Sequence, residues 1–433
     1  MNLSLLVPSA PLLTGALLLL VLLGLQARAA GQADPTVPAL LDKIDAWRGT
    51  AKTKLPASLT IEGTYAVTFA GAATAEPVVK GAFREAFVGD ELARHTSEMG
   101  AFGSLERGIR NQLVWEVDPS MGAKVHSGAN AAVVRRYFSL LRGVSPRDLY
   151  REFALAGTLE LDGREHTALR MVPAEGKPET WYLDADGTVA RIDMTLPTPE
   201  SADATFDLDD GLPSQLTFSD YRLVEGVRYP HRRKLVMGSA TVSFVCTKIE
   251  AGAKLDVARF VPPEAITKLK PAQTTAAVGS DGKPTYQVIE REAQAVASIR
   301  IKCKPDEIST QLAQLLPEVM AHLTATGGVM AGAPFSRYHA WGDTLDVEAG
   351  IPVRAPITEK GRIKNSTLPA GRTVTCWHVG PYHELGKAHE ALQAHMTKEK
   401  LTSRGGPWEV YWTDPGMVPD PAKWRTQIFA PIE

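Results

Sequence analysis

The stretch TVTCWHVGPYHELGKAHEALQAHM, residues 373–396, repeats the layout of an earlier stretch, ASIRIKCKPDEISTQLAQLLPEVMAHL, residues 297–323. In each stretch a strand-like run precedes a proline, and a run with helical spacing follows the proline. Both copies continue with a glycine-containing turn and two further strand-like runs, which end near Pro352 and Pro431. We therefore predict a strand–helix–strand–strand unit that occurs twice and packs about a pseudo-twofold axis.

The two copies differ at one position that matters for chemistry. When they are aligned on the proline after the glycine turn, Tyr338 aligns with Tyr411, but Ser336 aligns with Glu409. A crevice between two packed halves is a usual place for a small ligand. The alignment therefore makes Glu409 the first candidate for a binding residue.

The strand WEVYW, residues 408–412, indicates which way this glutamate points. Alternation along a strand places Glu409 and Tyr411 on one face and the two tryptophans with Val410 on the other. We expect the tryptophan face to pack on the helices, so that Glu409, Tyr411 and the aligned Tyr338 face the crevice. A carboxylate flanked by tyrosines can hold a cation through charge and ring faces. The alternative is an exposed strand glutamate between surface tyrosines.

Other reactive side chains in this region give weaker signals. Trp377 is a lesser candidate for ligand binding. Cys376 and His378 share a strand face and could form a nucleophilic pair, but a cysteine on a core-facing strand usually packs. Three histidines recur every six residues on the second helix, at His383, His389 and His395. This spacing turns each one 120° from its neighbour, so they cannot share a metal ion, and we expect neither metal nor cofactor.

The N-terminus reads as a secretory signal. Leu3 to Leu25 is almost uninterrupted leucine, valine and alanine, and a small-residue cleavage site ends at Ala29. We therefore predict a signal peptide over residues 1–29 and a periplasmic or secreted bacterial protein. The alternative is an uncleaved membrane anchor, because the run is long enough to span a bilayer.

Composition bounds the rest of the chain. About 400 residues are too many for one ordinary core, and we predict a domain over residues 34–268, a linker over 269–284 and a second domain over 285–433. The net charge of −2 argues against a nucleic-acid partner. The three cysteines lack the number and spacing of a disulfide framework.

The first domain has the pattern of an antiparallel sheet. Residues 59–69 alternate between apolar and polar side chains, as in a strand with one dry face. Asp162-Gly163 and Asp186-Gly187 have the composition of two-residue hairpin turns. Helices are expected over residues 38–48 and 130–142, the second extended past Pro146 to Phe153. The acidic runs at 184–187 and 207–211 lack calcium-loop spacing. The fold class is thus α+β.

The segments WYLDADGTVARIDM and FSDYRLVEGVRYPHRRKLVMGSATVSFVCTKIEAGAKLDVARFVPP resemble LolA-like periplasmic domains. The shared pattern is one of strands and turns and covers most of residues 34–268. The resemblance implies an incomplete β-barrel plugged by helices, whose interior holds an acyl chain or another apolar ligand. From the residues alone, the apolar face of strand 59–69 lines either a cavity or a packed core.

The second domain resembles the GyrI-like effector-binding domain, which is also the ligand module of some AraC- and MerR-type regulators. The matching marks are Val379-Gly380-Pro381-Tyr382, Glu409 with Tyr411, and Asp414-Pro415. The resemblance implies a small-molecule site for apolar, often cationic or aromatic compounds, with Glu409 as the pocket glutamate and Tyr382 beside it. In a minority of the family, that glutamate serves hydrolysis of strained electrophilic compounds.

These observations predict a non-enzymatic, exported two-domain binding protein. The second domain would bind a small amphipathic compound, and the first a lipid-like one. The alternative is a hydrolase of reactive small molecules that uses Glu409 and a tyrosine. The family's role in gene regulation is not expected, because an exported β-rich domain, and no helix-turn-helix pattern, precedes the ligand module.

Overall fold

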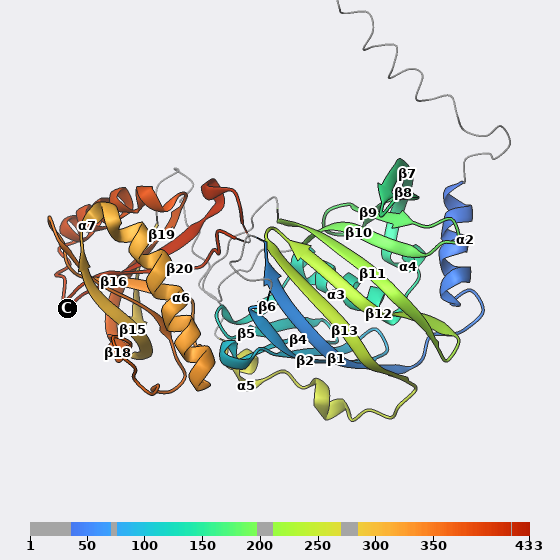
Figure 1. The fold of residues 1–433 in the computed structure, drawn as a ribbon, viewed down its shortest axis with the longest axis horizontal. Coiled ribbons are helices and arrows are strands. Elements are labelled where there is room, and N and C mark those ends of the chain that lie inside the picture. The colour runs from blue at the N-terminus through green and yellow to red at the C-terminus, as the bar shows by residue number, and fades with distance from the viewer. Residues whose placement is uncertain (1–35, 71–75, 197–210, 270–284, 417) are drawn as a thin grey trace, which may run out of the picture.

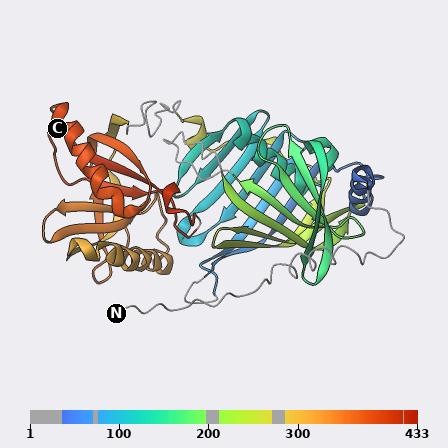
Figure 2. The same cartoon turned by 90° about the horizontal axis from the view of Figure 1, so that it is seen from above.

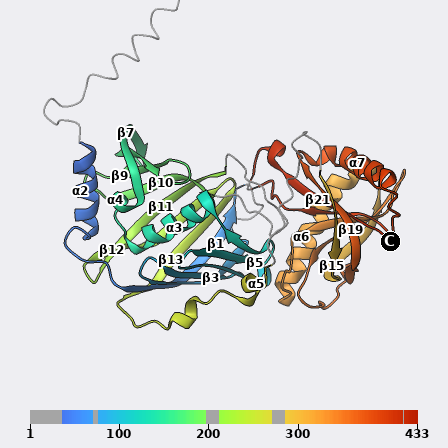
Figure 3. The ribbon, with the colours of Figure 1, turned by 180° about the vertical axis from the view of Figure 1, so that it is seen from behind.

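The computed structural model describes residues 36–70, 76–196, 211–269, 285–416 and 418–433. The predicted signal peptide, the predicted linker apart from Leu269, and Asp207 to Asp210 lie outside these residues. The strands form a 13-stranded and an eight-stranded sheet, which lie side by side (Figure 1 and Figure 3). No helix in the described ranges is long and apolar enough to cross a membrane.

The 13-stranded sheet is antiparallel and contains every strand before residue 252. Its order is β6-β5-β4-β3-β2-β1-β13-β12-β11-β10-β9-β8-β7, so the chain runs outward from β1 to one edge and returns from the other edge to β13. The strands are β1 (Ser58–Phe69), β2 (Val79–Val88), β3 (Leu92–Glu98), β4 (Ser104–Arg110), β5 (Leu113–Asp118), β6 (Gly122–His126), β7 (Tyr150–Leu161), β8 (Arg164–Pro173), β9 (Glu179–Leu183), β10 (Val189–Leu196), β11 (Leu212–Val224), β12 (Val227–Met237) and β13 (Ala240–Ala251).

This sheet curls around helix α3 (Gly128–Arg142) as a half-barrel, which Figure 2 shows from above. The predicted dry face of β1 is confirmed: Leu59, Ile61 and Tyr65 are buried in one apolar cluster with Phe138 and Leu141 of α3. Burial of this cluster holds the helix in the concavity. The predicted α+β class, with an antiparallel half-barrel and helices on one side, is confirmed.

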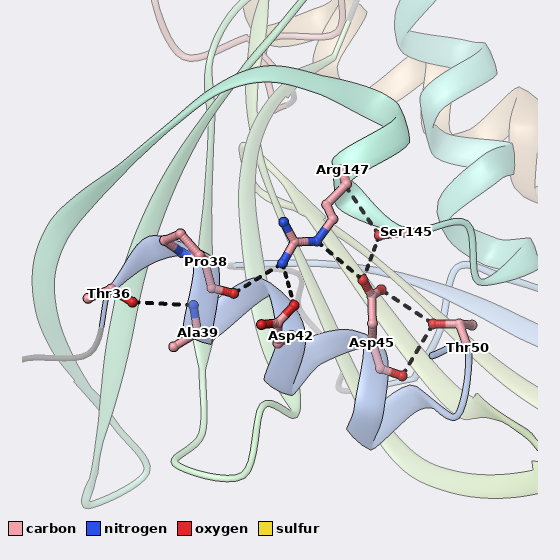
Figure 4. Close-up of polar contacts among 8 residues, drawn as sticks. All are labelled: Thr36, Pro38, Ala39, Asp42, Asp45, Thr50, Ser145 and Arg147. Carbon is pink, nitrogen blue, oxygen red and sulfur yellow. Dashed lines mark hydrogen bonds and ion pairs between the residues drawn. The ribbon is translucent and has the colours of Figure 1, made fainter. Parts of the chain in front are cut away.

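Helix α2 (Val37–Arg48) closes the end of the half-barrel that is far from the eight-stranded sheet (Figure 1). It begins at the N-cap Thr36, whose hydroxyl accepts a hydrogen bond from Ala39 N. Arg147 of the short helix α4 (Pro146–Leu149) reaches Pro38 O at 3.1 Å and Asp42 at 2.6 Å (Figure 4). These contacts attach α2 to the segment that follows α3.

Two local predictions for this domain were wrong. The second helix does not continue to Phe153, because β7 begins at Tyr150, whose ring packs at 5.9 Å against buried Trp181. Tertiary packing thus overrides helical spacing. Asp186 does not form a two-residue hairpin turn; the loop spans Asp184 to Thr188, and only Gly187 has positive φ. Asp162-Gly163 forms the predicted turn, with φ of 50° and 73°.

The eight-stranded sheet has the predicted internal symmetry. Its order is β14-β19-β21-β20-β16-β17-β15-β18, which maps onto itself when the halves are exchanged. Each half is a strand, a second strand, a helix and two more strands, so the predicted unit is present with one extra strand in front. The elements are β14 (Tyr286–Arg291), β15 (Gln294–Cys303), α6 (Ile308–Thr326), β16 (Phe335–Ala340), β17 (Leu345–Pro352), β18 (Lys364–Leu368), β19 (Gly371–Val379), α7 (Leu385–Lys398), β20 (Trp408–Tyr411) and β21 (Arg425–Pro431), with α5 (Glu264–Thr267) before them.

The connections show that this sheet is strongly curled. β14 stands first in the order and β15 seventh, yet only Glu292 and Ala293 separate them in sequence. Seven strands laid flat would hold these two about 29 Å apart, whereas three residue steps span at most about 11 Å. The edges must therefore approach each other, and the inner face of the curl is enclosed.

Hydrogen bonds join the two sheets at two places in the described part of the chain. Met330 N donates to the carbonyl oxygen of Ala101, which lies in the 3-10 turn η1 (Gly100–Phe102), at 3.1 Å. Ser239 N, in the β12–β13 turn, donates to Gly416 O at 2.9 Å. Phe102 packs against the cores of both sheets. Each half of the symmetric sheet thus touches the rim of the half-barrel.

Candidate functional site

One row of side chains crosses the outer face of the eight-stranded sheet and places Glu409 at its centre. Helix α6 covers β15 and β17 at one end of this face, and α7 covers β19 at the other. The strand register pairs neighbours along the row in the order Ile299, Ala349, Ser336, Glu409, Ile428 and Cys376. The Ser336–Glu409 pair therefore lies between the two helices, where the symmetry axis passes.

The tryptophan face of β20 was predicted to pack on the helices, and this prediction was wrong. Tyr411 packs with the apolar cluster of α7, whereas Trp408 and Val410 lie in the cluster on the inner face of the curl. Trp408 is completely buried there. Because a curled sheet covered by helices buries both faces, apolar character alone could not tell which face meets the helices.

Glu409 is almost completely buried, with 2% of its surface exposed. Its Oε2 accepts hydrogen bonds from Tyr411 at 2.6 Å, Tyr338 at 3.1 Å and Ser336 at 3.2 Å. Its Oε1 lies 2.8 Å from His389 Nε2. Antiparallel pairing accounts for this geometry, because it places Ser336 of β16 directly opposite Glu409 of β20. Tyr338 lies two residues after Ser336 and Tyr411 two residues after Glu409. Since the strands run in opposite directions, the two tyrosines flank the Ser336–Glu409 pair from its two ends.

The three hydroxyl groups share a limited supply of protons. Ser336 Oγ lies 2.6 Å from the Tyr411 hydroxyl and 3.2 Å from Glu409, and its single proton can serve one of them at a time. Burial, reinforced by the charge of Glu409, raises the pKa of both Tyr338 and Tyr411 well above the ordinary value. Both tyrosines therefore remain protonated donors to the carboxylate.

His389 and Trp341 complete the site, and neither was predicted. His389 comes from α7 and lies edge-on to Tyr338. Trp341 follows β16, stacks on Tyr338 with ring centroids 4.2 Å apart, and is 52% exposed. In the sequence, His389 is a candidate only for metal binding, and the alternation of β16 stops one residue before Trp341. A tryptophan three residues after Tyr338 was the available signal in the sequence.

The remaining candidates lie at different distances from Glu409. Tyr382, in the 3-10 turn η4 (Tyr382–Glu384), packs on Tyr411 with centroids 5.4 Å apart and donates to Thr413 O. It therefore borders the site. Trp377 lies on the other face of the sheet, opposite Gln427, and packs against Trp412. The structure does not bring Trp377 to Glu409.

The cysteines form no reactive arrangement. Cys376 is buried in the apolar cluster of α7, and burial raises the pKa of its thiol to about 12. His378 instead lies 3.2 Å from Pro381 O. Cys246, Cys303 and Cys376 are all free and buried. Across the described ranges, no group of three histidine, cysteine, aspartate or glutamate side chains is placed to hold a metal ion.

The inner face carries a second buried carboxylate, which is a useful comparison. Glu348 accepts from Ser298 at 2.7 Å and lies 2.9 Å from His339 Nε2. The symmetry-related positions hold Thr375, Gln427 and Trp412, and Gln427 bonds both of the others. The second half therefore reproduces this network without charge, so an amide is compatible with the fold at this position.

The interior of the half-barrel is packed and partly charged. Arg136 of α3 pairs with Glu179 at 2.8 Å, and Arg233 pairs with Glu85 at 3.0 Å. Burial opposes ionisation of Glu85, but Arg233 and His95 together hold its pKa below the ordinary value. The gap beside Leu140 and Trp181 has no room for a water molecule. In this state the concave face is a core.

The family described as the GyrI-like small molecule binding domain matches residues 284–433. This part of the chain is a GyrI-like domain. None of the curated proteins matches the chain. Among solved structures, the EcmrR–DNA complex is 24% identical with a TM-score of 0.33, over 34% of this chain and 57% of that chain. The isolated EcmrR C-terminal domain is 24% identical with a TM-score of 0.31, over 34% and 97%. This chain thus spans little more than half of the first of them.

The half-barrel has structural relatives of its own. A LolA superfamily protein from Nitrosomonas europaea is 11% identical with a TM-score of 0.34, over 52% of this chain and 98% of that chain. A DUF1329 family protein from Desulfovibrio piger is 16% identical with a TM-score of 0.36, over 53% and 98%. Both resemblances seen in the sequence recur among these proteins. The solved structures, with TM-scores below 0.5, carry no argument about function.

Proposed function

We propose that the protein is an exported two-domain binding protein whose GyrI-like domain binds small amphipathic cations at Glu409. The observation that carries the proposal is a carboxylate with 2% exposure whose hydrogen-bond and ion-pair partners in the described part of the chain are hydroxyl groups and a histidine, with no lysine or arginine among them. A buried carboxylate favours a positive partner, and Trp341 offers an exposed ring beside it. The matched family's description as a small molecule binding domain supports this proposal.

Fluorescence polarisation with rhodamine 6G, a planar cation, tests the proposal. We expect the wild type to bind it and Glu409→Gln to weaken binding at least tenfold, because the amide keeps the shape and removes the charge. Glu348→Gln is the matched control: it neutralises a buried carboxylate on the other face of the same sheet and should leave binding unchanged. Equal affinity of the wild type and Glu409→Gln would show that charge has no role.

One observation also favours a hydrolase as the second candidate. His389 Nε2 lies 2.8 Å from Glu409, so the site contains the second acid–base group that hydrolysis of an electrophile needs. Glu409 would orient or activate water, and Tyr338 or Tyr411 would donate a proton to the leaving atom. Consumption of a strained cyclic ketone or epoxide by purified protein, lost in Glu409→Gln, would favour this candidate over simple binding.

The half-barrel is the proposed second binding element, for an apolar or lipid ligand. Phe138 and Leu141 of α3 occupy its concave face, so an acyl chain can enter only if this helix moves away. The apolar run between Leu3 and Leu25 supports the proposed export. Mass spectrometry of protein purified from the periplasm or medium tests both points, since it detects a bound lipid and the mature N-terminus.

A further inference from the structure

We propose that His389 determines the ligand specificity of the Glu409 site, by restricting it to cations that donate N–H hydrogen bonds. Such ligands include amidinium, guanidinium and protonated aromatic amines. The inference rests on the proposed function, because it names the class of cation that the same site takes. It comes from the unequal surroundings of the two carboxylate oxygens.

The two oxygens of Glu409 differ in how firmly their partners are held. Oε2 accepts hydrogen bonds from three hydroxyl groups on β16 and β20, strands fixed by hydrogen-bonded pairing. Within the described residues, the only hydrogen-bond partner of Oε1 is His389. An incoming ligand would therefore have to displace hydroxyl groups on two paired strands to reach Oε2, but only the side chain of His389 to reach Oε1.

His389 is the partner that can leave. Its side chain is 13% exposed, against 2% for Glu409, and it belongs to a helix rather than to the strands that hold the hydroxyls. Its ring borders Trp341, with centroids 5.2 Å apart, and Trp341 is the exposed aromatic surface of the site. Rotation of the imidazole about its side-chain torsions frees Oε1 and leaves the three hydroxyl bonds unchanged.

The chemistry of the exchange selects the ligand. When His389 leaves, a buried carboxylate oxygen loses its donor, and an unsatisfied buried acceptor is costly. An amidinium or protonated amine restores both the hydrogen bond and a positive charge at Oε1. A quaternary ammonium or phosphonium ion restores only charge. The aromatic part of either ligand can lie against Trp341.

Calorimetric titration with benzamidinium and phenyltrimethylammonium tests this inference, because both are phenyl monocations and only the first donates N–H hydrogen bonds. We expect the wild type to bind benzamidinium at least tenfold more tightly. His389→Ala should bind benzamidinium about tenfold more tightly than the wild type, because no imidazole has to be displaced. His389→Gln, which keeps a donor, should stay close to the wild type, and circular dichroism checks folding.

The outcomes separate the inference from the function on which it rests. If the wild type binds both cations equally and Glu409→Gln abolishes both, cation binding stands and the role of His389 is wrong. If His389→Ala leaves the affinity for benzamidinium unchanged, the role of His389 is equally wrong. If the wild type binds neither cation at millimolar concentration but still binds rhodamine 6G through Glu409, the inference is wrong and the proposed function stands. If rhodamine 6G does not bind either, both fail.

Discussion

At the scale of single residues, the site is a near-symmetric arrangement with one carboxylate in it. Tyr338 and Tyr411 occupy equivalent positions and donate to the same oxygen of Glu409. Ser336 stands where the symmetry would place a second glutamate. Two carboxylates at this distance would repel each other inside a buried site, so the serine makes the glutamate tolerable.

The shared oxygen predicts coupling between the tyrosines. Tyr338→Phe and Tyr411→Phe should each lower the free energy of unfolding by about 1–2 kcal/mol. The single proton of Ser336 lies between the Tyr411 hydroxyl at 2.6 Å and Glu409 at 3.2 Å, so it can turn fully to Glu409 when one tyrosine donor is lost but cannot replace both. The double variant should therefore lose at least about 0.5 kcal/mol more than the sum. Urea unfolding of the four proteins measures this. The excess should disappear in a Ser336→Ala background, and strict additivity would contradict the geometry.

A histidine in the half-barrel predicts a dependence of stability on pH. Burial lowers the pKa of His126 to about 4. The negative charge of Glu116 opposes this shift, and the positive charges of Lys124 and Arg107 add to it. The ordinary value is about 6.5, so between these values the unfolded chain binds a proton that the folded chain does not. The contribution of His126 to stability is therefore lost as the pH falls from about 6.5 towards 4.

His126→Gln tests this dependence. Between pH 7.5 and 5.0 the free energy of unfolding of the variant should fall by about 1–2 kcal/mol less than that of the wild type. His383→Gln, at an exposed histidine, is the matched control and should follow the wild type. Urea denaturation at the two pH values gives the comparison, and equal falls in all three proteins would refute the assignment.

At the scale of elements, the two adjacent glycines before β20 differ in how much space surrounds them. A Cβ on Gly406 would lie 2.1 Å from the Tyr338 carbonyl oxygen, whereas a Cβ on Gly405 would meet nothing closer than 3.8 Å. Neither glycine has a positive φ, so space alone separates them. Gly406 therefore permits the close approach that brings β16 and β20, and with them Tyr338 and Glu409, together.

Alanine at each position tests this difference. Gly406→Ala should lower the free energy of unfolding by about 2–3 kcal/mol, because a backbone atom has to move, and should also weaken cation binding by displacing Tyr338. Gly405→Ala should stay within about 0.5 kcal/mol of the wild type. Thermal unfolding and the rhodamine titration measure both effects. Similar behaviour of the two variants would contradict the close approach.

The elements also show what the sequence could and could not predict. Alternation on β1 and the repeat around Pro381 were sufficient to predict which segments form strands and helices and their succession along the chain, because these depend on local periodicity. The helix predicted from Pro146 to Phe153 ends at Leu149, because Tyr150 gains more from packing on Trp181 than from helical spacing. The orientation of β20 failed because the curl that buries Trp408 comes from connections between distant strands. The contact between His389 and Glu409 could not be predicted, because the position of a residue in a helix does not show which strand residue that helix packs against.

At the scale of the whole molecule, the contacts between the sheets connect the candidate site to the half-barrel. Tyr411 packs on Tyr382, and Tyr382 bonds Thr413 O. The same loop continues to Gly416, whose carbonyl accepts from Ser239 of the β12–β13 turn. The other contact buries Ala101 among the side chains that pack on α6. We therefore expect the two sheets to stabilise each other.

Ala101→Arg tests this mutual stabilisation. A charged side chain forced into a site that is 5% exposed should separate the sheets, lower the midpoint of the first thermal transition by more than about 5 °C, and resolve two calorimetric transitions. Leu223→Arg, at a leucine that is 63% exposed, is the control. A calorimetric trace of Ala101→Arg that overlays the wild type would show that the sheets are independent.

The central claim is that a cation binds to the buried carboxylate of Glu409, and a crystal structure of the protein with benzamidinium measures this directly. We predict an amidinium nitrogen within hydrogen-bonding distance of Glu409 Oε1, the phenyl ring against Trp341, and His389 rotated away from the carboxylate. Benzamidinium bound elsewhere, with the bond between His389 and Glu409 intact at full occupancy, would contradict the claim.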